Sequence, residues 1–134
     1  MGDQQLYELK PTHKHAILKA FFKSRAFNQG QKMDLLETTL GEDKSDLTEN
    51  CRASCLASLP DSEVKARIWQ EITDPKSTDS TYLRNAKMAG FKSFEQLDLI
   101  EPYEDKFFDI LYEQHEKTTF KTFNSFFHSM LPRI

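Results

Sequence analysis

The chain is poor in residues that interrupt regular secondary structure, with four glycines and five prolines among 134 residues. A sandwich of many short β-strands needs frequent turns, so this scarcity favours long helices instead. A chain of this length forms one ordinary domain and cannot hold a catalytic domain plus a substrate domain. The sequence therefore predicts a single helical domain over residues 1–134, with a flexible N-terminal segment at 1–11.

The sequence also lacks a long apolar run, an apolar signal core and an excess of positive charge. A membrane-spanning helix needs roughly 20 apolar residues, which no stretch of this chain approaches. The formal net charge is −3, and cationic and anionic residues are interspersed rather than gathered in a basic stripe. The N-terminal Gly2 suggests myristoylation, but that motif needs Ser or Thr where the chain has Leu6. We therefore expect a cytoplasmic protein that binds neither membranes nor nucleic acid.

Apolar periodicity and capping residues predict seven helical segments. These cover about 12–27, 31–40, 45–60, 61–74, 79–89, 102–114 and 116–130, and residues 93–99 form a short helix or a turn. Short polar loops place neighbouring helices antiparallel, and several helices carry more than one apolar stripe, as in stacked hairpins. The predicted fold is all-α, with antiparallel helical hairpins stacked as a short HEAT-like or armadillo-like solenoid. A compact irregular bundle is the alternative.

Glycine and asparagine predict where several helices end. Asn28 and Gly30 tolerate positive φ and are interpreted as the stop of the first helix, and Gly41 as the stop of the second. Gly90 followed by Phe91 is typical of a Schellman ending, in which the apolar side chain folds back onto the helix.

Two cysteines and four histidines are the only soft ligands available. Cys51 and Cys55 lie on one helix face, but a metal site would need two more soft ligands nearby. We interpret both as buried structural thiols in a reducing compartment. No histidine has a nucleophile or carboxylate partner at a meaningful spacing, so a structural or surface role is predicted for all four: His13, His15, His115 and His128.

The nearest approach to a catalytic motif is His115-Glu116. A zincin motif, H-E-x-x-H, places two histidines at i and i+4 so that both reach one metal. Here the i+4 residue is Thr119, and no Asp or Glu follows Glu116 to supply a third ligand. Glycine-rich phosphate loops, nucleophile elbows and paired-carboxylate constellations are also missing from the sequence. We therefore expect no catalytic residue, no metal and no cofactor.

Phenylalanine is concentrated near the C-terminus, where six of the eleven fall between Phe107 and Phe127. Such a concentration is found in docking grooves and in helical cores. Because the spacing is helical and two segments contribute, a core is the favoured interpretation.

Packing and capping residues in the middle of the chain carry a resemblance to a known family. They are the runs DKSDL at 43–47, LPDSEVKARIW at 59–69, MAGF at 88–91 and PY at 102–103. These runs resemble the C-terminal helical domain of the zinc aminopeptidase N family, most strongly from about Asp43 to Met130. The resemblance implies a curved, HEAT-like helical domain that closes the peptide chamber over a thermolysin-like catalytic domain. The family's zinc ligands and its G-x-M-E-N motif lie in other domains, so no catalytic residue carries over to this chain.

Two functions follow as hypotheses. The first is a free-standing, non-catalytic interaction or scaffold module that binds protein partners, such as a large assembly or an aminopeptidase catalytic domain. The alternative is a C-terminal fragment or subunit of a zinc aminopeptidase that shapes the peptide chamber and controls access to it. In that case Arg67, Arg84 and Lys87 are the candidate cavity-facing charges.

The first helix offers a structural test of both hypotheses. Ile17 and Phe21 lie on one apolar stripe and Leu18 and Phe22 on a second beside it. If the chain is a detached end of a solenoid, these four residues should form an exposed apolar patch that a missing neighbour would cover.

Overall fold

The computed structural model describes residues 11–93 and 96–132, and the regular structure within these ranges is entirely helical. The helices are α2 (Pro11–Lys23), α3 (Gln29–Leu40), α4 (Asp46–Ala57), α5 (Ser62–Thr73), α6 (Thr81–Phe91), α7 (Leu97–Ile100), α8 (Pro102–Lys117) and α9 (Phe120–Met130). This confirms the all-α prediction. The segment predicted as flexible lies outside the described residues, except that Pro11 begins α2. None of the described helices has the length and apolar content needed to cross a bilayer.

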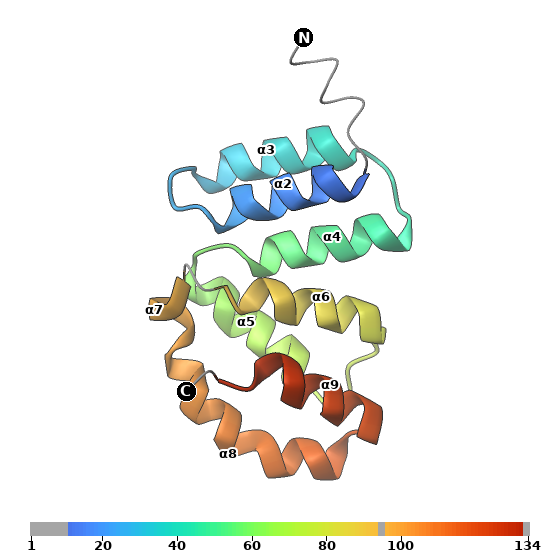
Figure 1. Cartoon of the computed structure of the whole chain (residues 1–134), viewed down its shortest axis with the longest axis vertical. Helices are drawn as coiled ribbons and strands as arrows, with labels where there is room; N and C mark the ends of the chain where they lie inside the picture. Colours follow the sequence, from blue (N-terminus) through green and yellow to red (C-terminus); the bar gives the residue numbers. More distant parts are fainter. Residues whose placement is uncertain (1–10, 94–95, 133–134) are drawn as a thin grey trace.

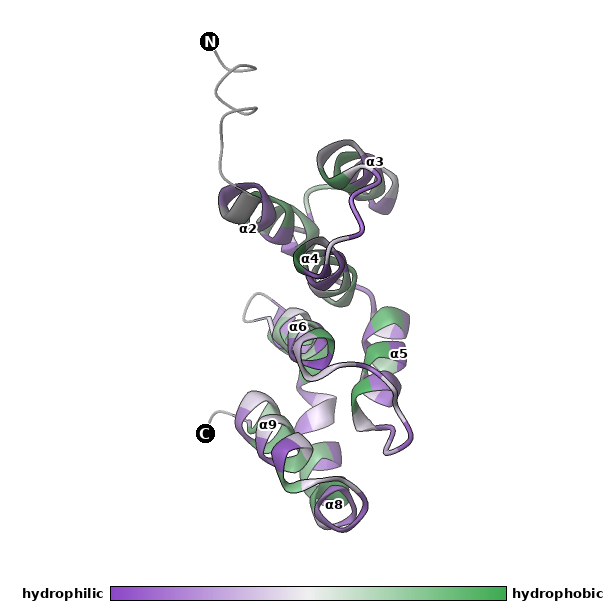
Figure 2. Ribbon diagram, turned by 90° about the vertical axis from the view of Figure 1, so that its right-hand side faces the viewer, coloured by the Kyte–Doolittle hydropathy of each residue, from purple (hydrophilic) through white to green (hydrophobic). Residues whose placement is uncertain are grey.

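Consecutive long helices run antiparallel and are stacked along the long axis of the molecule (Figure 1). Figure 2 shows α2, α4, α6 and α9 following one another in one column, with α3, α5 and α8 beside them. Within the first column α4 packs against both α2 and α6, and α6 packs against α9. The pair α2 and α3 therefore forms one end of the stack and α8 the other, an arrangement compatible with the predicted solenoid-like packing.

Side-chain caps explain where most helices begin. The Ser45, Asp61, Ser80 and Thr119 side chains each accept a hydrogen bond from a backbone N–H in the first turn of the helix that follows. Asn28 does the same for α3, and its own N–H donates to the Gln31 side chain, which completes a capping box.

The interpretation of Asn28 and Gly30 as the end of the first helix is therefore wrong. α2 stops at Lys23, about one turn before the predicted end, and Asn28 starts the next helix. The ammonium group of Lys32 accounts for the early stop, because it takes the carbonyl oxygens of Phe22 and Ser24 as acceptors.

The two other predicted glycine stops have different outcomes. Gly41 caps α3 with a φ of 59°, as predicted. Gly90 is instead a residue of α6, which continues to Phe91, and among the described glycines only Gly41 has positive φ. A Cβ atom at Gly90 would lie 2.2 Å from the carbonyl oxygen of Ser54 and 2.9 Å from Cβ of Ala57. Gly90 therefore permits close approach of α6 to the small residues of α4.

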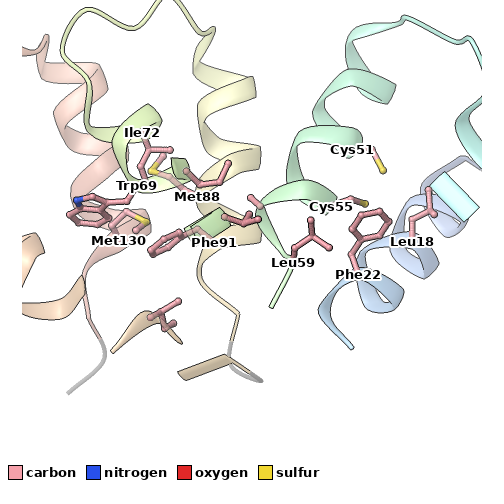
Figure 3. Packing of buried hydrophobic residues seen from close by; sticks show 14 of the residues in the cluster. Leu18, Phe22, Cys51, Cys55, Leu59, Trp69, Ile72, Met88, Phe91 and Met130 are labelled. Carbon is pink, nitrogen blue, oxygen red and sulfur yellow. The ribbon is translucent and has the colours of Figure 1, made fainter. Parts of the chain in front are cut away.

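The buried apolar residues form one cluster that runs along the stack (Figure 3). Leu18 and Phe22 of α2 lie at one end beside Cys55 of α4, and Trp69 and Met130 lie toward the other. The predicted exposed patch on the first helix is thus only half present. Leu18 and Phe22 are core residues, Ile17 is exposed, and Phe21 is half-buried with its ring stacked on Phe27 at 4.0 Å. The patch test consequently does not favour a detached solenoid end through these four residues.

The last two long helices meet slightly later than predicted. α8 continues through Glu116 to Lys117, and α9 begins at Phe120 with Thr119 as its N-cap. The short helix or turn predicted at 93–99 is represented by α7, which covers Leu97–Ile100, and residues 94–95 lie outside the described ranges.

Candidate functional site

The two cysteine thiols are buried side by side within the core. Cys51 and Cys55 are free and buried, as predicted from their spacing on α4 (Figure 3). The hydrogen bond with Cys51, together with burial, raises the pKa of the Cys55 thiol above its ordinary value. The same hydrogen bond lowers the pKa of the Cys51 thiol. Both side chains are buried in the apolar cluster, so the two residues contribute to the packing of the core.

The histidines are distributed over the molecule rather than gathered at a site. His13 is exposed and His15 is buried, so they lie on different sides of α2 as predicted. Burial, reinforced by the nearby Lys19 charge, lowers the pKa of His15. Within the described ranges, no group of three or more His, Cys, Asp or Glu side chains is placed to hold a metal ion.

The incomplete zincin motif is divided between two helices. His115 lies in the last turn of α8, with Nδ1 3.8 Å from Oε1 of Glu116. Thr119 is the N-cap of α9 and accepts a hydrogen bond from the N–H of Thr122. Positions 115 and 119 therefore do not share a helix face, which removes the geometry that the motif requires.

The three charged residues predicted to face a cavity do not all lie at one place in the structure. Lys87 binds Asp79 at 2.6 Å and Glu71 at 3.1 Å, and these contacts offset the effect of burial and raise its pKa. Arg67 is exposed and lies 4.0 Å from the same Glu71. Arg84 alone of the three is buried and lines a polar cavity. The structure thus links Arg67 to Lys87 through one carboxylate and leaves Arg84 apart from them.

Lys65 is a second candidate because burial lowers its pKa to about 7, within the range of functional lysines. The side chain is fully buried, and Nζ donates to the carbonyl oxygens of Ala57 at 2.7 Å, Phe91 at 3.2 Å and Gly90 at 3.4 Å. These carbonyls belong to the last residues of α4 and α6. Carbonyl oxygens at a helix C-terminus have no N–H donor within their own helix. Lys65 is therefore a structural residue that ties two helix C-termini together.

The same device recurs through the fold. Gln96 donates to the carbonyl oxygens of Lys23 and Ser58, and Gln114 donates to that of Thr73. Together with Lys32, these side chains donate hydrogen bonds to backbone carbonyl oxygens at the C-terminal ends of α2, α4 and α5. Four buried polar side chains, those of Lys32, Lys65, Gln96 and Gln114, thus donate hydrogen bonds to carbonyl oxygens at helix C-termini.

The outward face of α8 is the surface best suited to binding. Tyr112 is 76% exposed and Phe108 is 53% exposed. Positions 105, 109, 112 and 116 follow one another at helical spacing, so Asp105, Asp109 and Glu116 share this face with Tyr112, and all three are exposed. We call these five residues the α8 face. The opposite side of α8 packs on the core through Phe107.

Two of the three carboxylates of the α8 face, those of Asp105 and Asp109, have no cationic partner in the part of the chain that the structure describes, whereas Glu116 lies 3.8 Å from His115. Asp105 and Asp109 form no ion pair with any residue of the ranges 11–93 and 96–132. They are four residues apart on one helix, an arrangement that destabilises an isolated helix by a few tenths of a kcal/mol. Aromatic rings surrounded by unpaired carboxylates at the end of a stack favour a basic, apolar ligand.

The concentration of phenylalanines is divided between core and surface. Phe107 and Phe126 are fully buried with ring centroids 5.4 Å apart, which confirms the core interpretation for these two. Phe108 and Phe120 are exposed. A helical projection of residues 102–117 could have separated Phe107 from Phe108, because adjacent positions on a helix differ by about 100°.

Comparison of the chain with protein-family models, curated proteins and solved structures found no match in any of the three. The resemblance to an aminopeptidase C-terminal domain therefore stays a prediction based on the residues that carry it.

Proposed function

We propose that this chain is a non-catalytic helical interaction module whose α8 face binds a basic amphipathic segment of a partner protein. The observation that carries the proposal is the exposure of Tyr112 among the unpaired carboxylates Asp105 and Asp109. Tyrosine is enriched among the residues that dominate binding energy, because its ring gives a large contact area at low entropic cost. Carboxylates around such an anchor attract Lys and Arg and suppress acidic partners.

The proposal is tested with helical peptides of matched apolar content that are rich in Lys and Arg, neutral, or rich in Asp and Glu. Fluorescence anisotropy with the full chain should show the basic peptide binding tightest, with an affinity that falls as salt screens the charges. Replacing a central tyrosine anchor typically costs 2 kcal/mol or more, so Tyr112→Ala should weaken binding by roughly 30-fold.

A matched control is available in the same chain. Tyr82 on α6 is 77% exposed, against 76% for Tyr112, but lies away from the α8 face. Tyr82→Ala should therefore bind the basic peptide like the wild type. Equal weakening by both substitutions, or equal binding of basic and acidic peptides, would contradict the proposal. A pull-down from the native source with wild-type and Tyr112→Ala baits would then identify the partner as a protein lost only from the variant.

The opposite end of the stack supports a second candidate function. Ala16 and Ala20 on α2 line an open groove together with Lys19 and Lys23, and Ile17 is exposed beside them. In a zinc aminopeptidase the catalytic domain would cover such a face, and this chain would help to shape the peptide chamber. Co-purification of the chain with an H-E-x-x-H-containing protein from the same source, lost on Ala20→Glu, supports this function. Its persistence in that variant counts against it.

A further inference from the structure

A polar cavity of about 220 Å³ lies where α6 and α9 begin. α6 packs against α9, and both helices start at the right-hand side of Figure 1. The charged residues of the lining are Arg84, Lys117 and Asp79. The cavity is also lined by six hydroxyl side chains: Ser77, Thr81, Thr118, Thr119, Thr122 and Ser125.

Arg84 is the unusual member of this lining. Its side chain comes from the first turns of α6 and is only 7% exposed. Nη1 of Arg84 is buried and has no hydrogen-bond partner among the described residues. Two other buried side-chain atoms in these ranges also lack a partner, namely the amide oxygens of Gln96 and Gln114. Arg84 and Thr81, at the start of α6, both line the cavity. A buried guanidinium N–H without an acceptor is costly.

The position of Arg84 explains why the chain does not supply that acceptor. Lys32 and Lys65 are buried at helix C-termini, where unpaired carbonyl oxygens accept their protons. Helix N-termini offer the reverse, namely unpaired N–H groups and the positive end of the helix dipole. Arg84 adds a positive charge to a place that is already positive, and acceptors are scarce there.

The one carboxylate of the lining is engaged elsewhere. Asp79 accepts a hydrogen bond from Lys87 at 2.6 Å, and Lys87 also lies 3.1 Å from Glu71. Lys117 at the rim donates to Glu113 at 2.6 Å. The lining thus contains two cations against one carboxylate, and the buried cation is the one without a counter-charge.

We propose that this cavity binds a phosphate group, either as inorganic phosphate or as a phosphomonoester. A tetrahedral oxyanion would accept hydrogen bonds from the guanidinium of Arg84, from hydroxyls such as Thr81 and Thr122, and from the first N–H groups of α6 and α9. A water molecule occupies about 30 Å³ of liquid, so the cavity has room for an anion with four oxygens. The proposal is independent of the α8 face.

The direct test is a titration of the ¹⁵N-labelled full chain with inorganic phosphate at constant ionic strength, the balance being chloride. The N–H groups of Leu83 and Thr122 already donate to the caps Ser80 and Thr119. Backbone N–H groups that receive an oxyanion shift downfield, so saturable shifts are expected for residues 81–82 and 120–121. A second arm uses a short neutral phosphothreonine peptide and its unphosphorylated form. Tighter binding of the phosphopeptide than of inorganic phosphate would identify the phosphomonoester as the ligand, and the reverse would identify the free anion.

Variants separate a site from a general salt effect, because phosphate stabilises most proteins by exclusion from their surface. Arg84→Met keeps an unbranched side chain in place of the aliphatic part of arginine and removes the guanidinium, and it should fold with an unchanged or higher Tm in chloride because a buried unpaired charge is lost. Arg67→Met removes an exposed arginine and serves as the matched control. Phosphate should shift the resonances and raise the Tm of the wild type and of Arg67→Met saturably, and Arg84→Met should lose at least tenfold in affinity.

Two outcomes would overturn the proposal. One is the absence of saturable shifts at the starts of α6 and α9 in the wild type, a measurement that needs no variant. The other is an identical phosphate response from Arg84→Met and the wild type, which would assign the effect to salt exclusion alone.

Discussion

The contact between α4 and α6 at Gly90 makes a sharp prediction about packing. A Cβ at this position would lie 2.2 Å from the carbonyl oxygen of Ser54, whereas ordinary van der Waals contact begins at 3.4 Å. The opposing atom is backbone in a helix, so it cannot rotate away as a side chain could. Gly90→Ala must therefore push the two helices apart by about 1 Å along the whole contact.

The magnitude follows from two opposing effects. Replacing Gly by Ala inside a helix stabilises it by about 1 kcal/mol. Overpacking costs about 1–3 kcal/mol when side chains can adjust, and a rigid backbone contact lies at or beyond the upper end. Separation of α6 from α4 also weakens the hydrogen bonds from Lys65 to both helix ends. We expect a net loss of about 2–4 kcal/mol in the free energy of unfolding, which lowers the Tm by roughly 10 °C.

Gly30 provides the control, since it is also a helical glycine but is exposed in α3. A Cβ there would meet only Oδ1 of the Asn28 side chain, at 3.3 Å. Gly30→Ala should leave the free energy of unfolding unchanged or raise it by up to about 1 kcal/mol. Urea denaturation followed by circular dichroism measures both variants. A Gly90→Ala protein as stable as the wild type would refute the close contact between α4 and α6.

Two further substitutions test the helix ends. The pKa of Lys65 is lowered to about 7 in the folded chain, so between pH 7 and about 10.5 the unfolded chain holds a proton that the folded chain has lost. Unfolding then takes up a proton, so the free energy of unfolding of the wild type should rise with pH relative to that of Lys65→Met, by up to about 1.4 kcal/mol per pH unit. Urea titrations of both proteins at pH 7.5 and 9 measure this difference. Parallel changes with pH in the two proteins would contradict the prediction. Asn28→Ala removes the capping box of α3 and should lower the free energy of unfolding by about 1 kcal/mol, whereas the same change at the exposed, non-capping Asn124 should cost little.

The sequence was a good guide wherever the signal is local. Ser45 and Asp61 start their helices as predicted, because an N-cap needs only its own side chain and the next turn. Apolar periodicity identified the helical segments, and the shared helix face of Cys51 and Cys55 indicated their burial. Periodicity alone does not explain Tyr82, which is spaced four residues from Ala86 and yet is exposed, because the tight contact at Gly90 determines which side of α6 meets α4.

Asparagine at position 28 shows where local reasoning is ambiguous. Asn is favourable both after the end of one helix and before the start of the next. The outcome depends on Gln31, which completes the capping box, and on Lys32, which reaches back across ten residues to the carbonyl of Phe22 and ends α2 early. A prediction from periodicity alone takes no account of contacts between helices, and it therefore places the end of α2 about one turn too late.

The two proposed sites differ in how far the sequence could have revealed them. The α8 face lies within one helix, so a helical projection of residues 102–117 is enough to place Tyr112 opposite Phe107. The polar cavity joins Arg84 to Thr122, 38 residues away in the sequence, and only the packing of α6 on α9 brings them to one place.

Buried cations are the hardest feature to predict, because Lys and Arg are mostly exposed and their burial leaves no mark in the sequence. Once the helices are placed, the end of the helix that each cation meets distinguishes its role. Lys65 meets C-terminal carbonyls, and its three hydrogen bonds make it part of the structure. Arg84 meets N-termini, where the chain offers donors rather than acceptors, and its Nη1 has no partner among the described residues. The polarity of the helix end therefore separates Lys65, which joins two helix C-termini through hydrogen bonds, from Arg84, for which we propose an anion as the partner.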